Sequence, residues 1–279
     1  MKPTFPIYSP EKSIFFNHRL MLNVHSEEFR PHTHAVCELI LFKKGKVTYS
    51  VQGKNYRLRK DDLIITRPSE MHGVIPNIGS DYERYNILFD EKTLPFDIFK
   101  KIPPKIDVIN VGHNHIIMDA FEKMDYYEKQ LPETQLNLLL INLCQEILIN
   151  VLLELDTNKT YANYTVTNEI VSNAIAYIDE NLLDIVSVEE VANALFVAKS
   201  HLHRLFMKTI NISPKKYIVS KKLVLAQREI LSGKNPTKLY EKYGFNDYSS
   251  FYRAYRNHFG ISPSEKNLTE IVAADNNIL

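Results

Sequence analysis

The chain has 279 residues, of which 44% are hydrophobic and 24% are charged. These proportions are typical of a folded protein and exclude collagen-like, low-complexity and disordered chains. At about 100 to 200 residues per domain, the length predicts two domains. We find no uninterrupted apolar run of about 20 residues and no basic N-terminus followed by an apolar core, so we expect no membrane span, no signal peptide and a cytoplasmic location. Cys37 and Cys144 are far apart, which argues against a disulfide framework or a thiolate zinc site.

The net charge of +1 conceals an uneven distribution of charged residues. Residues 185–266 contain 14 Lys and Arg against 6 Asp and Glu, whereas residues 1–184 contain 20 against 25. A polyanion responds to local charge rather than to the average of the chain, so the basic segment is suited to a nucleic-acid surface. The alternative is a lysine-rich helical surface without such a partner.

Short apolar stretches separated by turn residues follow one another in the first third of the chain. They lie at residues 38–42, 46–51, 62–66 and 84–89. Turn signals such as Gly45, Gly53 and Pro68 separate them. This pattern predicts short antiparallel strands in a small barrel or sandwich.

Helical periodicity begins after Pro103-Pro104, at residues 113–129 and 133–155. The apolar stripe of the second helix is too wide for a single buried face. Either this helix packs on the barrel with one side and on a partner subunit with the other, or it is fully buried within its own domain.

A polar stretch at residues 157–167 lacks amphipathic periodicity and predicts a linker. It divides an N-terminal domain, residues 1–156, from a C-terminal domain, residues 168–279. A helix is expected at residues 168–183, followed by short helices whose starts carry capping signals. These signals are Ser187-x-x-Glu190, Ser213-Pro214, Asn235-Pro236 and Ser262-Pro263-x-Glu265.

An internal repeat with an offset of 49 residues organises the C-terminal domain. It aligns Leu202 with Phe251, Arg204 with Arg253, and the tripeptide at 212–214 with that at 261–263. Each copy predicts a short helix, a tight turn and a second helix, which is a helix-turn-helix. The predicted helices are 188–195 and 199–209 in the first copy, and 236–243 and 247–259 in the second.

The second helix of a helix-turn-helix enters the major groove, and the residues opposite its core face contact base edges. Arg204 and Arg253 occupy equivalent places and are the first candidates, because guanidinium bound to guanine is the commonest specific contact. The outward-facing residues are Lys199, Ser200, His203, Arg204 and Met207 in the first copy, and Tyr248, Ser249, Tyr252, Arg253 and Arg256 in the second.

A helix at residues 214–231 is expected to connect the two copies. Its length of about 27 Å, at about 1.5 Å per residue, is close to one turn of B-DNA, about 34 Å. The two recognition helices could therefore enter successive major grooves. Lysines around the connecting helix are expected to contact phosphate. They are Lys215, Lys216, Lys221, Lys222 and Lys234.

The C-terminal domain resembles the AraC/XylS family of bacterial transcription regulators over nearly 100 residues. The likeness is carried by Val191-Ala192 with Leu195, Leu202-x-Arg204-Leu205-Phe206, Ile212-Ser213-Pro214, Tyr243-Gly244-Phe245, Phe251-x-x-x-Tyr255 and Gly260-Ile261-Ser262-Pro263. The resemblance implies base contacts at Ser200, His203 and Arg204, and at Tyr248, Ser249, Ser250 and Arg253. Both copies depart from the family pattern. In the first copy, Phe196 replaces the usual turn glycine and Ala198 replaces the usual serine. In the second copy, bulky residues near Tyr240 replace an alanine that usually precedes the turn.

The N-terminal domain resembles the cupin-type barrel of the sugar-sensing branch of this family. The residues that carry this likeness include Pro31-His32-Thr33-His34, Glu38, Gly53, Pro68 and His72. In cupin enzymes such a set binds a metal, which here would be held by His32, His34, Glu38 and His72. We favour a metal-free barrel without a cofactor, which binds a small molecule. The expected effector contacts are Arg30, His34, Glu38, Tyr49, Arg67, His72 and Tyr85, with Tyr56 as a second candidate for ring stacking.

The sequence therefore predicts an α+β protein with a cupin-like β-barrel, a helical dimerisation element and an all-α domain with two helix-turn-helix units. We expect a dimeric, ligand-responsive, sequence-specific transcription regulator whose effector is a sugar or a related molecule, not an enzyme. Its expected partners are promoter DNA, the effector, RNA polymerase and a second copy of the chain. Two alternatives are a constitutive regulator that uses the barrel only to dimerise, and a metal-dependent cupin enzyme fused to a DNA-binding domain.

Overall fold

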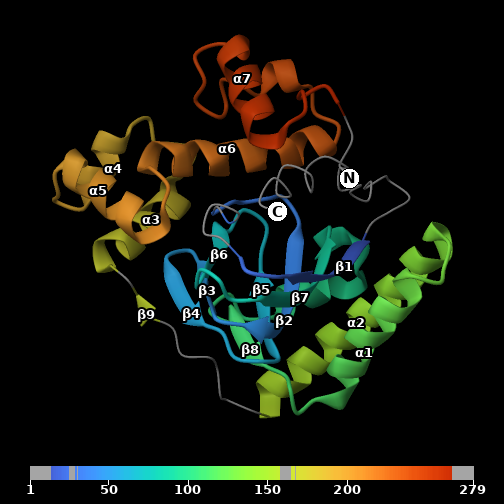
Figure 1. Ribbon diagram of the computed structural model, residues 1–279. Helices are drawn as coiled ribbons and strands as arrows, with labels where there is room; N and C mark the ends of the chain where they lie inside the picture. The colour runs from blue at the N-terminus through green and yellow to red at the C-terminus, as the bar shows by residue number, and fades with distance from the viewer. Residues whose placement is uncertain (1–13, 25–28, 30, 158–164, 167, 266–279) are drawn as a thin grey trace.

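The computed structural model describes residues 14–24, 29, 31–157, 165–166 and 168–265. Within them the chain forms two antiparallel sheets, two long helices beside the sheets and a separate group of helices (Figure 1). This is the α+β architecture that the sequence predicts. The expected effector residue Arg30 lies outside the described residues.

The two sheets contain all the strands of the described residues. One sheet has the strand order β1-β7-β2-β5-β8, and the other has the order β6-β3-β4-β9. The strands are β1 (Ile14–Met21), β2 (Cys37–Gly45), β3 (Val47–Val51), β4 (Lys54–Arg57), β5 (Asp62–Thr66), β6 (His72–Pro76), β7 (Tyr82–Phe89), β8 (Val108–Asn110) and β9 (Thr165–Val166). Strand β9 falls within the expected linker and pairs with β4.

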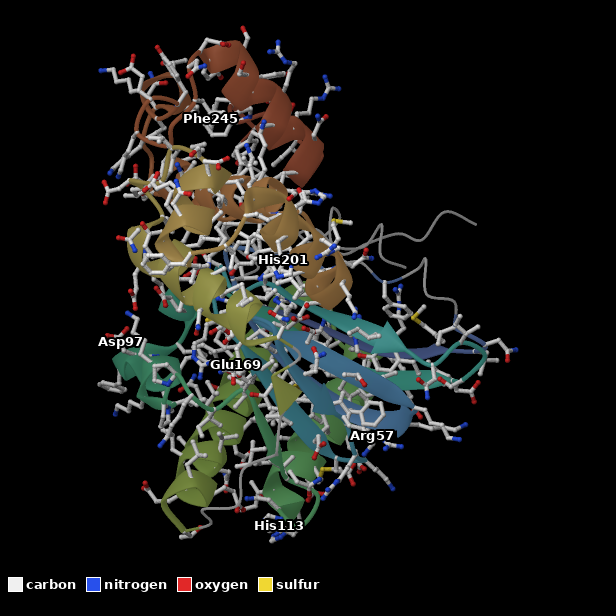
Figure 2. All side chains as sticks on the ribbon, turned by 90° about the vertical axis from the view of Figure 1, so that its left-hand side faces the viewer. Arg57, Asp97, His113, Glu169, His201 and Phe245 are labelled. Carbon is white, nitrogen blue, oxygen red and sulfur yellow. The ribbon has the colours of Figure 1, made fainter. Side chains whose placement is uncertain are left out.

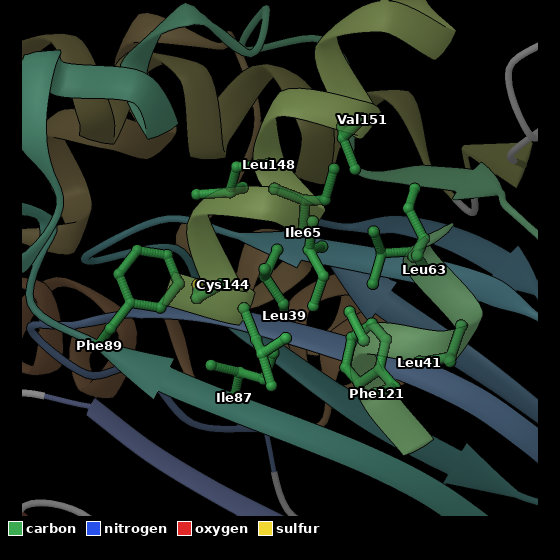
Figure 3. Close-up of a cluster of buried hydrophobic side chains, with 14 of the residues drawn as sticks. Leu39, Leu41, Leu63, Ile65, Ile87, Phe89, Phe121, Cys144, Leu148 and Val151 are labelled. Atoms are coloured by element: carbon green, nitrogen blue, oxygen red, sulfur yellow. The ribbon is translucent and has the colours of Figure 1, made fainter. Parts of the chain in front are cut away.

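Both faces of the five-stranded sheet are covered. On the outer face, Leu39 and Ile87 pack against Phe121 of α1 (His115–Glu128) and against α2 (Glu133–Thr157), as Figure 3 shows. On the inner face, Ile40 and Tyr82 belong to the cluster that fills the space between the two sheets. Because side chains alternate along a strand, neighbouring residues belong to different cores. The short 3-10 helices η2 (Glu91–Thr93) and η3 (Pro95–Lys101) follow β7.

Helix α2 is buried on one side only, so it is not the fully buried helix that the sequence left open. By length and composition it is the one helix of the described residues that could cross a membrane. Its inner side nevertheless packs on the sheet through residues such as Ile147 and Val151, both fully buried. Leu138, Ile149 and Leu153 are 66%, 49% and 55% exposed, and their spacing places them on one side of the helix. This exposed side is available to a partner.

The C-terminal helices form two small cores that share α6. The first core joins α3, α4 and α5 to the first half of α6, and the second joins the rest of α6 to α7. The helices are α3 (Glu169–Asn181), α4 (Val188–Ala194), α5 (Lys199–Ile210), α6 (Pro214–Leu231) and α7 (Tyr248–Phe259). The connecting helix α6 has the predicted bounds, because Ser213 caps it and Pro214 occupies its first turn.

One predicted helix of the second unit is wrong. Residues 236–243 form the 3-10 helix η4 (Pro236–Lys238) followed by turns. The segment begins at Pro236 and ends at Gly244, whose φ of 75° lies in the left-handed region. A segment this short adopts the tighter 3-10 geometry at little cost.

The barrel contacts both helical cores. Met71 joins the core of the first unit, and Ala35 joins the core of the second. Gln52, at the turn between β3 and β4, donates to Asp179 of α3 at 2.7 Å and accepts from Tyr217 of α6 at 2.8 Å. In Figure 1, α6 lies across one end of the barrel, with α5 and α7 near its two ends.

Candidate functional site

The recognition helices α5 and α7 present a basic, polar side to solvent. Leu202 and Phe206 of α5 are fully buried, as is Phe251 of α7, so the opposite side of each helix faces outward. On α7, Asp247 caps the helix by accepting from the Ser250 amide at 2.7 Å. On α5, the equivalent Ala198 offers no side-chain cap. The first helix therefore starts with less local stabilisation.

The predicted base-contacting residues lie on this outward side. Those that are exposed are Lys199, Ser200, His203, Arg204, Ser249, Arg253 and Arg256. Those that are half-buried are Tyr248, Ser250 and Tyr252. Arg204 lies 2.8 Å from His201 and Arg253 lies 3.2 Å from Ser250, each one turn earlier on the same helix. Figure 2 labels His201 on α5 and Phe245 ahead of α7. Contacts between DNA bases and the predicted residues of α5 and α7 stay a prediction.

Each turn between the paired helices contains one residue in the left-handed region. In the second unit this residue is Gly244, and in the first unit it is Phe196, with φ of 55°. The side chain of Phe196 is 96% exposed. A residue with a Cβ pays a steric cost of roughly 1 to 2 kcal/mol there. Phe196 thus adopts the conformation of the glycine that it replaces in the family pattern.

Two of the expected phosphate contacts are wrong in this conformation. Lys221 and Lys222 are 5% and 6% exposed. Lys221 pairs with Asp179, and Lys222 donates to the carbonyl of Ile185 at 2.7 Å. Their ammonium groups hold α3 and the loop after it against α6, so they serve the helical core. The sequence missed this because a lysine on an apparently amphipathic helix is usually solvated.

A second site lies between the sheets, around the carboxylate of Glu38 on β2. Glu38 accepts from Thr66 at 3.2 Å and from Asn86 at 2.9 Å. The Nε2 atoms of His72 and His34 lie 3.1 Å and 3.6 Å from the same carboxylate. Burial opposes ionisation of Glu38, but the hydrogen bonds and charge of His34 and His72 outweigh it and hold the pKa well below its usual range.

The imidazoles of this cluster are oriented by backbone carbonyls. The Nδ1 atoms of His34 and His72 lie 3.0 Å from the Val36 carbonyl and 2.8 Å from the Glu70 carbonyl. A carbonyl only accepts, so Nδ1 carries a proton. Nε2 therefore donates to Glu38 when the ring is protonated and presents a lone pair when the ring is neutral. Burial lowers the pKa of His72, and the nearby His32 adds to the effect. Tyr49 stacks on His72 with 6.3 Å between ring centroids.

The same donors fit a metal ion. One ligand atom from each of His32, His34 and His72 lies within 4.8 Å of the others, and the carboxylate of Glu38 adjoins them. Neutral imidazoles held through Nδ1 and facing an ionised carboxylate are a donor set suited to a divalent transition metal. These four residues would hold the ion, which would act as a Lewis acid toward an oxygen atom of a bound molecule.

Two expected effector contacts do not join this cluster. Tyr85 packs on the outer face of the sheet, stacked on Phe121 of α1 with 5.8 Å between centroids. Arg67 donates to the carbonyls of Pro103 and Ile106 at 2.9 Å each. The hydroxyl of Tyr56, the second candidate for ring stacking, donates to Asp107 at 2.7 Å. Tyr85 and Arg67 are therefore structural residues of the barrel.

Thr66 and Asn86, which were not predicted from the sequence, both bind the carboxylate of Glu38. Asn86 alternates with Tyr85 and Ile87 along β7, so it lies on the other face of the sheet. This alternation was available in the sequence. The sequence does not show which of the two faces of β7 points between the sheets, because β7 has buried residues on both sides.

Comparison with known families follows this division of the chain. Residues 21–98 match the AraC-like ligand binding domain, and residues 191–267 match a helix-turn-helix domain. The first match falls on the barrel with the Glu38 cluster, and the second on the two helix-turn-helix units. The two domain matches confirm the resemblance to AraC-type transcription regulators.

Individual relatives of this chain are regulators by name. It is 34% identical over 89 residues to the probable transcriptional regulator LumQ of Photobacterium leiognathi, a match that spans 32% of this chain and 36% of LumQ. It is 22% identical to the lactose operon transcription activator of Staphylococcus xylosus, over 81% of this chain and 82% of that protein. Among solved structures, ToxT of Vibrio cholerae is 11% identical over 91% of this chain and 97% of that one, with a TM-score of 0.38.

Proposed function

We propose that this protein is a ligand-responsive, sequence-specific DNA-binding regulator in which the barrel, residues 1–156, controls the helix-turn-helix domain, residues 168–279. The observation that carries the proposal is the segment at residues 31–36. His32 and His34 belong to the cluster around Glu38. The residues that alternate with them, Thr33 and Ala35, contact the second helix-turn-helix unit.

Thr33 and Ala35 link the segment to the helical domain. His258 of α7 hydrogen-bonds the backbone of Thr33, and Ala35 lies in the core formed by α6 and α7. The other side of the segment is fixed to the barrel, since His32 and His72 exchange two backbone hydrogen bonds of 2.9 Å. A ligand that moves the imidazoles therefore displaces the surface on which α7 rests.

A coupling variant tests this route. Ala35→Asp places a carboxylate in the apolar core between α6 and α7, so it should change operator affinity and make that affinity insensitive to the effector. Binding of the effector to the barrel should stay within about threefold of wild type. Lys46→Ala, an exposed change at the far end of β3, is the control. If Ala35→Asp retains the full effect of the ligand on DNA binding, the segment does not transmit it.

DNA recognition is assigned to the exposed sides of α5 and α7, with Arg204 and Arg253 as base readers. Arg253→Ala should cost about 1 to 3 kcal/mol of specific binding and relax one base position. The matched control is Arg57→Ala, which removes the same charge from an exposed place on the barrel (Figure 2). Selection from randomised DNA measures both effects. Unchanged base preference would remove Arg253 from the readout.

The effector is proposed to be a sugar or a related molecule. Glu38, His34 and His72 are hydrogen-bonding groups suited to hydroxyls, and Tyr49 adds a ring face beside them. The name of the Staphylococcus xylosus relative, a lactose operon activator, supports this class. Isothermal titration with a panel of sugars tests it. Binding of an unrelated metabolite, with no sugar bound, would contradict it.

We further propose that two copies associate through the exposed side of α2, and that the regulator acts with RNA polymerase in the cytoplasm.

Metal analysis of the purified protein separates this regulator from a metal-dependent enzyme built on the same barrel, which requires near-stoichiometric iron, manganese or zinc. The matched relatives are regulators by name, which favours a regulator over an enzyme.

A further inference from the structure

A row of polar side chains lines the inner face of β1 and β7. In the antiparallel register of these strands, Asn17 lies opposite Asn86 and Arg19 lies opposite Arg84. Directly opposed residues point to the same side of a sheet. Asn86 contacts Glu38 between the sheets, so this side is the interior. The four residues thus extend the Glu38 cluster toward the edge of the five-stranded sheet, where β1 lies.

The alternate residues of the same strands confirm the assignment of the faces. His18, which precedes Arg19, contacts Asp125 of α1 at 3.1 Å on the outer face. Tyr85, which follows Arg84, stacks on Phe121 of the same helix. Helix α1 covers only the outer face, so Arg19 and Arg84 face away from it.

Several polar atoms in this row are buried without a hydrogen-bond partner among the described residues. They are Asn17 Oδ1, Asn86 Oδ1 and Arg84 Nε. The amide orientation of Asn86 is fixed, because its nitrogen donates to the Glu38 carboxylate and its oxygen must point the other way. A buried polar atom left unpaired costs about 1 to 3 kcal/mol. Neighbouring unpaired atoms on two paired strands are the arrangement expected of a binding site.

The two arginines have no acidic partner within the part of the chain that the structure describes. The guanidinium of Arg84 lies 5.3 Å from the centre of the Tyr82 ring. Burial lowers the pKa of Arg19, and the charge of Arg84 lowers it further. Two like charges placed directly opposite each other destabilise a sheet. An anion between them removes this penalty, whereas a neutral molecule leaves it in place.

We propose that the effector is a hydroxylated anion, an acidic or phosphorylated sugar, whose anionic group binds Arg19 and Arg84 and whose hydroxyls donate to Asn17 and Asn86. The assignment rests on the proposed function and narrows its ligand class. Guanidinium groups bind carboxylate and phosphate through paired, charge-assisted hydrogen bonds, and amide oxygens accept from hydroxyls. Carboxylate and phosphate share this chemistry, so the experiment separates them.

The test uses full-length protein and matched probes. Glucose, gluconate and glucose 6-phosphate, with the corresponding galactose set and inorganic phosphate, are compared by isothermal titration and by the melting temperature. We expect the acidic or the phosphorylated member of a set to bind at least tenfold more tightly than its neutral parent. Binding should weaken as salt rises, because the contact is ionic. The acid and the phosphate ester are separate arms and identify the anionic group.

Variants locate the binding. Arg84→Gln should lower affinity for the anion at least tenfold, whereas Arg84→Lys should retain part of it. Arg57→Gln, which removes the same charge from an exposed place on β4, should change nothing. In ligand-free protein, Arg84→Gln should raise the melting temperature, because it removes one of the two opposed charges. This readout needs no knowledge of the ligand.

Three outcomes would overturn the inference: equal affinity for the neutral parent, an unchanged affinity in Arg84→Gln, or no response to any anion of the panel. If neutral sugars bind and alter operator affinity while the anions do not, the inference is wrong and the proposed function stands. If anions bind at Arg19 and Arg84 and no ligand alters operator affinity, the proposed function is wrong and the anion site stands.

Discussion

Gln52 is the residue through which the barrel holds the first helix-turn-helix unit, and its removal should release that unit. Its side-chain amide nitrogen donates to Asp179 at 2.7 Å. Its amide oxygen accepts from the Tyr217 hydroxyl at 2.8 Å and from the Met71 amide at 3.0 Å. The first two bonds join the barrel to α3 and α6. Gln52→Ala removes both and leaves the packing of β3 and β4 in place.

The expected magnitude follows from the two lost bonds. A hydrogen bond to a charged group contributes about 1.5 to 3 kcal/mol, and one between neutral groups about 0.5 to 1.5 kcal/mol. The bond from Gln52 to Asp179 reaches solvent, so we take the lower end of the range, about 2 kcal/mol for the pair. At about 1.4 kcal/mol per factor of ten, docking of the two domains should weaken roughly 30-fold.

Amide hydrogen exchange measures this effect directly. In Gln52→Ala, amides of α3 and of the first half of α6 that lie against the barrel should exchange faster, and amides of the sheet that carries Leu39 should not. In the variant, the ligand should also have a smaller effect on operator affinity than it has in wild type. Lys46→Ala is the control, since Lys46 is exposed at the opposite end of β3. Equal exchange in wild type and Gln52→Ala would refute the reasoning.

Three further predictions concern the turn, the pH response and the exposed helix. Phe196→Gly should raise the free energy of unfolding by about 0.5 to 1 kcal/mol, because it removes left-handed strain from a side chain that is 96% exposed; a lower melting temperature would show that the phenyl ring packs. Burial lowers the pKa of His258 to about 4. The unfolded chain therefore binds the proton first as pH falls below about 6.5, and stability should drop by at most about 2 kcal/mol by pH 5; His258→Gln should flatten this part of the pH profile. Ile149→Glu with Leu153→Glu should turn a dimer into a folded monomer in light scattering; a dimer that persists would exclude this side of α2 as the interface.

Local signals predicted the helical domain well. The predicted caps at Ser187 and Ser213 are formed, and each depends on residues close in sequence. Because a helix is stabilised by contacts three and four residues apart, its bounds can be read from such signals. The 3-10 helix at Pro236 was not predicted, because its geometry depends on the position of the turn at Gly244.

The effector site could be predicted only in part. His34, Glu38, Tyr49 and His72 do come together between the sheets. Tyr85 and Arg67 do not join this cluster, whereas Thr66 and Asn86, which the sequence did not predict, do. In a sheet with one solvent-exposed face, polar residues identify that face, and the residues that alternate with them belong to the buried face. Here helices cover one face and a second sheet covers the other, so a polar side chain on either face is buried and alternation does not tell the two apart.

The sequence by itself determined the repeated helix-turn-helix, the length of α6 and the presence of strands in the N-terminal domain, because periodicity and capping act over a few residues. The tertiary structure decided which residues serve the sites. It buried Lys221 and Lys222 against α3, turned Tyr85 outward, and placed Arg19 opposite Arg84. These outcomes depend on contacts between residues far apart in the chain, such as the strand pairing that joins residues 19 and 84.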